Sequence, residues 1–156
     1  MKLFVFLLLL STTAWAQKSA RALAYSLLQE SWRVPKTRAQ ALEAFKALPD
    51  IKKRLDKDAL RLNVQGINFD LTYGLQGEKI DWVSWRSQGA GTQVYDQLVL
   101  LVTPAEIERA RERFKKQRGH RRGQFLDVES EGVVFRFHFE TRTLYSLTIT
   151  DWGRGP

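Results

Sequence analysis

The sequence predicts an α+β fold, in which an antiparallel sheet of about seven strands carries helices on one face. Three observations predict it: stretches of strict alternation between apolar and polar residues, two helix starts with capping boxes, and short turns between successive strands. Consecutive strands joined by short turns pair as antiparallel neighbours, and such a sheet can leave one face in water.

Comparison of the chain with itself at an offset of 66 residues predicts a degenerate tandem repeat over residues 37–85 and 103–152. Thr37 falls on Thr103, and each threonine opens a capping box whose oxygen accepts from an N–H of the first helical turn. The offset also aligns a glycine and an apolar stripe: Gly66, Ile67, Phe69, Leu71 and Tyr73 with Gly132, Val133, Phe135, Phe137 and Phe139. Two unrelated helix-plus-hairpin units would give a similar layout.

The expected elements follow from hydrophobic spacing and from the positions of proline and glycine. Helices are expected at residues 18–32, 37–48 and 104–118, with a short helix from 49 to about 56. Strands are expected at residues 59–65, 66–75, 79–86, 93–102, 124–130, 132–140 and 144–152. The polar partners in the alternation should lie on the open face of the sheet: Asn68, Asp70, Thr72, Val134, Arg136 and His138.

The first sixteen residues have the pattern of a cleavable secretory signal peptide. Lys2 gives a positive start, residues 3–10 are all apolar, and Ala14-Trp15-Ala16 is a small-x-small cleavage site. The apolar run is much shorter than the roughly 20 residues needed to span a bilayer. We therefore expect residues 17–156 to form a single α+β domain without a transmembrane segment, with repeat one at about 36–102 and repeat two at about 103–152.

Composition indicates a bacterial periplasmic protein, or one that is secreted. The chain has no cysteine, whereas many small secreted domains depend on disulfides. It also has no Asn-x-Ser/Thr glycosylation site, since Asn63 and Asn68 are followed by other residues. Both absences favour a bacterial envelope location.

Positive charge gathers in one stretch of the sequence. Residues 103–122 hold eight Lys and Arg against three Glu, which is most of the formal net charge of +8. Such a field favours an anionic partner, and secretion argues against nucleic acid. An anionic envelope surface and an acidic protein are the two candidates, while a merely solvated helix face would give the same composition.

The sequence offers little for catalysis or metal binding. His120 and His138 are the only histidines, and a metal site normally needs three or four ligands. The serines lie in no Gly-x-Ser-x-Gly context. We therefore expect no catalytic residue, no metal ligand and no cofactor, and we favour a binding protein over an enzyme.

Aromatic and basic residues are the positive signal for binding, because Trp and Arg are enriched in binding hot spots. Trp82 and Trp85 are three residues apart, so they should face opposite sides of their strand. The tryptophans would also suit the core or its rim. The expected partner-binding residues are Arg118, Arg121, Arg122, Lys116, Trp85, Trp152, Arg136 and His138.

The layout resembles small bacterial envelope modules with helices on one face of an antiparallel sheet. In tandem form it resembles the secreted β-lactamase inhibitor proteins, and in single form the outer-membrane assembly module with the same helix-helix-strand order. The resemblance covers most of residues 17–156 and concerns architecture alone, so no site residue is carried over. The expected function is non-catalytic binding of a protein, as an inhibitor or immunity protein. The alternatives are an envelope-assembly or anionic-glycolipid-binding factor and an uncharacterised hydrolase.

Overall fold

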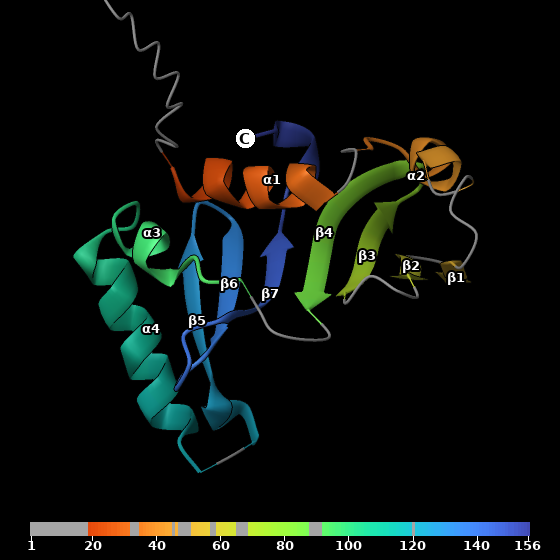
Figure 1. Ribbon diagram of the computed structural model, residues 1–156. Coiled ribbons are helices and arrows are strands. Elements are labelled where there is room, and N and C mark those ends of the chain that lie inside the picture. The colour runs from red at the N-terminus through yellow and green to blue at the C-terminus, as the bar shows by residue number, and fades with distance from the viewer. Residues whose placement is uncertain are drawn as a thin grey trace, which may run out of the picture.

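Antiparallel pairing of strands builds one sheet in the computed structural model, in the order β1-β2-β3-β4-β7-β6-β5 (Figure 1). The structure describes residues 19–31, 35–44, 46, 51–56, 59–64, 69–87, 92–119 and 121–156. The expected signal peptide lies outside these residues. The strands are β1 (Ile51–Asp56), β2 (Ala59–Val64), β3 (Phe69–Gln76), β4 (Lys79–Ser87), β5 (Phe125–Ser130), β6 (Val133–His138) and β7 (Leu144–Ile149).

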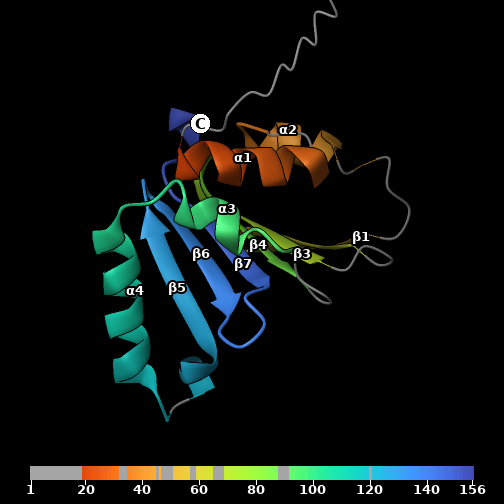
Figure 2. The same cartoon turned by 60° about the vertical axis from the view of Figure 1, so that its left-hand side comes forward.

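The helices are α1 (Ala20–Ser31), α2 (Arg38–Ala44), α3 (Tyr95–Val99) and α4 (Pro104–Gln117), with 3₁₀ turns at η1 (Arg121–Gln124) and η2 (Trp152–Arg154). Both α1 and α3 lie in front of the same face of the sheet in two views (Figure 2). The long helix α4 runs beside the edge strand β5. The α+β class with an antiparallel sheet is confirmed. No helix in the described part of the chain is long and apolar enough to cross a membrane.

Two expected elements are wrong. Residues 93–102 were expected as a strand, but they contain α3, in which Val94, Tyr95 and Leu98 are buried. These three positions have helical spacing, and the exposed Asp96 and Gln97 lie between them, as expected for one turn of a helix. The short helix expected from residue 49 to about 56 is instead β1, which pairs with β2 along its whole length. Pairing with a neighbouring strand has overridden the local preference there.

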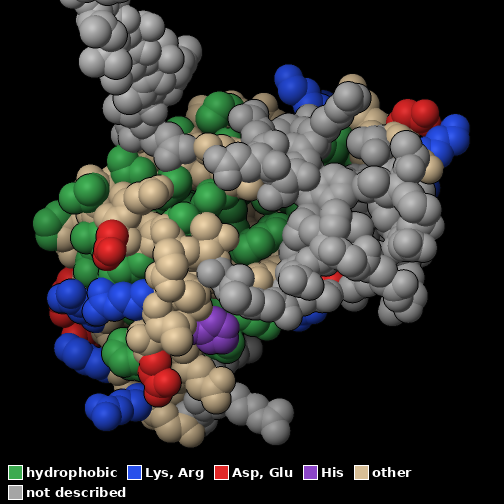
Figure 3. Space-filling view, viewed as in Figure 1, with side chains coloured by type: hydrophobic (Ala, Val, Ile, Leu, Met, Phe, Trp, Pro, Cys, Tyr) green, Lys and Arg blue, Asp and Glu red, His purple; other side chains and the backbone are tan. Residues whose placement is uncertain are grey.

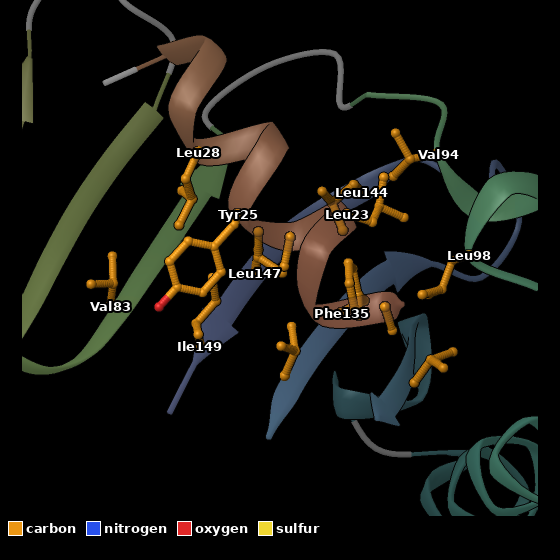
Figure 4. Close-up of a cluster of buried hydrophobic side chains, with 14 of the residues drawn as sticks. Leu23, Tyr25, Leu28, Val83, Val94, Leu98, Phe135, Leu144, Leu147 and Ile149 are labelled. Atoms are coloured by element: carbon orange, nitrogen blue, oxygen red, sulfur yellow. The ribbon is translucent and has the colours of Figure 1, made fainter. Parts of the chain in front are cut away.

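The core lies between the helices and one face of the sheet (Figure 4). Alternate residues of β6 are buried, namely Val133, Phe135 and Phe137. Leu23 and Leu28 of α1 pack into the same cluster. The side chain of Phe135 has no exposed surface, as the alternation predicts; that of Phe69 is outside the described residues.

Capping boxes at the starts of α2 and α4 differ in completeness. Thr103 accepts from the backbone N–H of Glu106 at 3.3 Å, and Glu106 accepts from the backbone N–H of Thr103 at 2.6 Å. Thr37 accepts from the N–H of Gln40 at 3.2 Å, but the Gln40 side chain accepts from Lys36 instead of Thr37. The box at the start of α4 is therefore reciprocal, whereas at the start of α2 the Gln40 side chain bonds one residue before the capping threonine.

Replacing either capping threonine with alanine should lower the free energy of unfolding by about 1 kcal/mol, because one N–H of the first turn loses its acceptor. The losses from Thr37→Ala and Thr103→Ala should add to within about 0.5 kcal/mol, since the two helices are separate elements. Chemical denaturation measures both, and Thr92→Ala, an exposed threonine outside the helices, is the control. Unchanged midpoints would show that these oxygens contribute nothing.

The strand registers test the equivalences expected from the tandem repeat. β4 and β7 are neighbours at the middle of the sheet, and each of the hairpins β3–β4 and β6–β7 contains a bulge. Gly74 pairs with Trp82 at the first bulge, and Arg136 pairs with Ser146 at the second. Superposing the bulges would align Gly74 with Arg136 and Trp82 with Ser146, at offsets of 62 and 64. The sequence comparison instead aligns the residues before the hairpin at an offset of 66 and those after it, such as Trp82 with Ile149, at 67. The duplication therefore stays a prediction.

Candidate binding surface

The face of the sheet opposite the core is polar and partly exposed. Alternation places Asp70 and Thr72 of β3 on this face, as expected, together with Arg136 and His138 of β6. Asn68 falls outside the described residues. The helices α1 and α3 cover the opposite face, and α4 borders this face at its β5 edge, where Arg113 pairs with Glu129. This surface is called the open face below.

A continuous row of charged and polar side chains crosses the open face. Register pairs Asp70 with Arg86, Arg86 with Ser146, Ser146 with Arg136, and Arg136 with Asp127. Arg86 donates from Nη2 to Asp70 at 2.6 Å. Arg136 donates from Nε and Nη2 to both oxygens of Asp127, each at 2.7 Å. The row thus spans five neighbouring strands, from β3 to β5.

The aspartates hold both arginines in place and charged. The hydrogen bond to Asp70 raises the pKa of Arg86, and the hydrogen bonds to Asp127 raise the pKa of Arg136. The Arg136 and Asp127 side chains keep 40% and 20% of their surface exposed, so both reach the protein surface. A bidentate carboxylate fixes the plane of a guanidinium, which lowers the entropy cost of using it in binding.

Bulges bring aromatic side chains onto the same face. The β6–β7 bulge leaves Tyr145 outside the regular pairing, and its ring lies 4.6 Å from that of Phe125 and 5.2 Å from that of His138. At the β3–β4 bulge the indole of Trp82 covers Gly74, in the space that a side chain there would fill. Bulges commonly redirect side chains at functional surfaces.

The two tryptophans expected to bind a partner lie on the helix side of the sheet. Trp85 pairs with Leu71 and Leu147 and packs against the core. Trp152 is 4% exposed, stacks on Tyr25 at 4.6 Å, and donates from its indole N–H to the carbonyl of Pro35 at 2.7 Å. Trp152 is therefore a core residue, which corrects its expected role, and Trp85 does not face the open side.

The basic residues of α4 form a separate surface at the edge of the sheet, where Lys and Arg side chains gather (Figure 3). Lys116 and Arg118 are exposed there, as expected. Arg113 forms an ion pair with Glu129 at 2.8 Å, and Lys115 forms one with Glu112 at 2.8 Å. The side chains of Arg121 and Arg122 lie outside the description. Part of the positive field of α4 is thus neutralised locally.

A polar cavity of about 260 Å³ lies between α4 and the β5–β6 hairpin. Arg109 and Arg113 line it on the helix side, and Glu129 and Ser130 on the strand side. Burial raises the pKa of Glu106 at its rim, but hydrogen bonds from Thr103 and Ser130 outweigh that effect and hold the pKa below its ordinary value. Arg113 and Glu129 pair across the cavity at 2.8 Å, and Asp127, which also lines it, is held by Arg136 of the open face.

Sequence reasoning placed Arg136 and His138 on the open face but missed their neighbours there. Arg86, Asp127, Tyr145 and Phe125 join them only through strand pairing and a bulge. Asp127 and Arg136 are nine residues apart across a hairpin, so their opposite charges were the available sequence signal.

No protein-family model matches the chain, and no curated protein or solved structure matches it either. The fold and the open face define it as an α+β protein with one helix-covered and one exposed sheet face.

Proposed function

We propose that this chain is a non-catalytic binding protein that recognises a protein partner through the open face of its sheet. It acts in the bacterial periplasm or after secretion, as the N-terminal sequence pattern and the lack of cysteine suggest. An inhibitor or immunity protein is the form of this function that we favour. A first unit of α2 with strands β1 to β4 and a second of α4 with strands β5 to β7 would give it one wide sheet surface.

The row of charged and polar side chains that crosses the open face from Asp70 to Asp127, called the cross-strand row below, is the observation that carries the proposal. Its arginines are held by Asp70 and Asp127. The Arg136 guanidinium lies over the ring of Phe125 at 5.7 Å, and Arg86 hydrogen-bonds to the Tyr145 side chain. Arg and Tyr are enriched in binding hot spots, and side chains fixed on paired strands bind with little loss of conformational freedom. Surface ion pairs alone stabilise a fold by only about 0–1 kcal/mol, so stability does not account for this arrangement.

A hydrolase remains a weaker alternative. Within the described residues, no group of three or more His, Cys, Asp and Glu could hold a metal ion. The ring of His138 lies against Phe125 and Tyr145, at centroid distances of 5.0 and 5.2 Å. A general base would instead need an orienting acceptor and a nucleophile within hydrogen-bond reach.

A second candidate is the envelope-assembly or anionic-glycolipid-binding role, and the exposed cations of α4 favour it. Lys116 and Arg118 lie on the solvent side near the end of the helix, and Leu100, just before its start, is 87% exposed. The partial neutralisation of α4 by Glu112 and Glu129 makes this role second to the open face.

Filling the centre of the open face should abolish partner capture. Thr148→Arg places a long charged side chain beside Ser84, whose hydroxyl lies 3.1 Å from that of Thr148. Tagged wild-type and variant proteins would be incubated with envelope extract from the producing cells, and the captured proteins compared by mass spectrometry. A protein retained by the wild type should be lost with Thr148→Arg.

The matched control is Gln97→Arg, which adds the same charge at an exposed position of α3 on the helix side. This variant should retain the captured protein. Loss with both variants, or retention with both, would contradict the open face as the binding surface. Circular dichroism and thermal melting verify that both variants fold.

A further inference from the structure

The order of the charges along the cross-strand row determines which kind of group this surface can bind. Asp70 and Asp127 stand on β3 and β5, whereas Arg86 and Arg136 stand on β4 and β6, the immediate neighbours of β7. With strands about 4.8 Å apart, the arginine backbones are about 5 Å from β7 and the aspartate backbones about 10 Å. The nearest full charges to β7 are thus both positive.

The two ion pairs of the row do not use every donor of its arginines. Asp127 uses the Nε and Nη2 groups of Arg136, so Nη1 is left for another acceptor within the described residues. Ser146 of β7 pairs with both arginines, and its hydroxyl lies on the open face between them. The Tyr145 hydroxyl hydrogen-bonds to Arg86. Arg86 is held from Nη2 by Asp70 and keeps 55% of its side-chain surface exposed.

We propose that the strip over β7, between Arg86 and Arg136, binds a single carboxylate side chain of the protein partner. This inference rests on the proposed function and names the chemistry of its contact. The two arginines and two aspartates of the row sum to zero, so the positive potential over β7 is local and short-ranged. A singly charged, planar carboxylate suits such a site, whereas a phosphate of charge near −2 would also meet the two flanking aspartates.

A small acidic probe tests the site without knowledge of the partner. N-acetyl-aspartate α-methylamide carries one side-chain carboxylate, and N-acetyl-asparagine α-methylamide is its neutral isostere. The readout is the ¹⁵N–¹H shift of the arginine Nε–Hε groups during titration, with Arg86 and Arg136 assigned from Arg86→Lys and Arg136→Lys. Saturable shifts should appear at both arginines, with a midpoint at least tenfold lower for the aspartate probe than for the asparagine probe.

Two lysine variants and a titration with inorganic phosphate test the inference further. Arg136→Lys keeps the charge but loses the planar fork, so it should raise the midpoint at Arg86 at least fivefold, whereas Arg111→Lys on α4 should not. The amide spectrum reports whether each variant keeps its fold. Shifts that stay linear, or that equal those of Arg111, overturn the proposal. Saturation by inorganic phosphate at a lower midpoint than the aspartate probe overturns it as well, because the site would then select phosphate.

Failure here is distinguishable from failure of the proposed function. Should Thr148→Arg release the captured protein while the aspartate probe gives no saturable shift, the open face binds its partner through other groups, and only the carboxylate site is wrong. Should Thr148→Arg leave capture unchanged, the proposed function is wrong whatever the probe shows.

Discussion

Replacing Phe135 with alanine should lower the free energy of unfolding by about 3–5 kcal/mol, the range for large-to-small changes of buried aromatic residues. The ring has no exposed surface and pairs across the sheet with Val128 on one side and Leu147 on the other. Removing it loses the transfer energy of the ring and leaves a cavity that helices and strands on both sides prevent from collapsing. Urea denaturation followed by tryptophan fluorescence measures the loss.

Phe139→Ala is the matched control, since it removes the same atoms four residues along the chain. Phe139 is 46% exposed and stacks on Phe114 at 3.9 Å, so its loss should cost about 1 kcal/mol. Equal effects of the two substitutions would contradict the assignment of β6 as a strand with one buried face.

Replacing Arg21 with methionine should destabilise the protein by about 3 kcal/mol, because its guanidinium ties α1 to the C-terminus. Arg21 is 3% exposed. It donates from Nε to the carbonyl of Gly155 at 2.6 Å, from Nη2 to that of Asp151 at 2.6 Å, and from Nη1 to those of Glu131 and Thr150. A buried carbonyl without a donor costs about 1–3 kcal/mol, and water can replace part of this set near the surface.

Arg21→Lys separates charge from geometry. A lysine keeps the positive charge but cannot reproduce the planar fork that reaches four carbonyls, so it should recover less than half of the loss. Amide exchange should also quicken in residues 150–155, where Asp151 is held at a φ of 52°. If the Arg21→Met variant were as stable as the wild type, the guanidinium would not be the group that fixes the C-terminal turn.

The α+β class could be predicted because it depends on local patterns. Alternation at residues 133–138 fixed both the strand and its buried face, since a strand exposes its side chains to opposite sides in turn. Thr103 and Glu106 marked the start of α4, because a capping box involves only residues within one turn.

The errors arose where a pattern allowed two interpretations. The mainly apolar stretch 94–102 suits a buried strand or a short helix. The helix α3 is favoured because Tyr95 packs edge-on against Phe137, with ring centroids 5.2 Å apart. β1 has strand geometry because β2 supplies its hydrogen-bond partners. Trp152 looked equally suitable for a surface or a core, and Tyr25 and Pro35, more than a hundred residues away, place it in the core.

The sequence by itself determined the secondary-structure class, the position of the basic helix and the buried faces of β5 and β6, because each depends on neighbours a few residues apart. Only the tertiary structure decided which side chains share the open face. Arg86 and Arg136 are fifty residues apart in the chain, and they lie in one row because each pairs with Ser146 of β7. The local sequence does not encode that register, because it is set by how well the whole sheet pairs and how well the helices cover its other face.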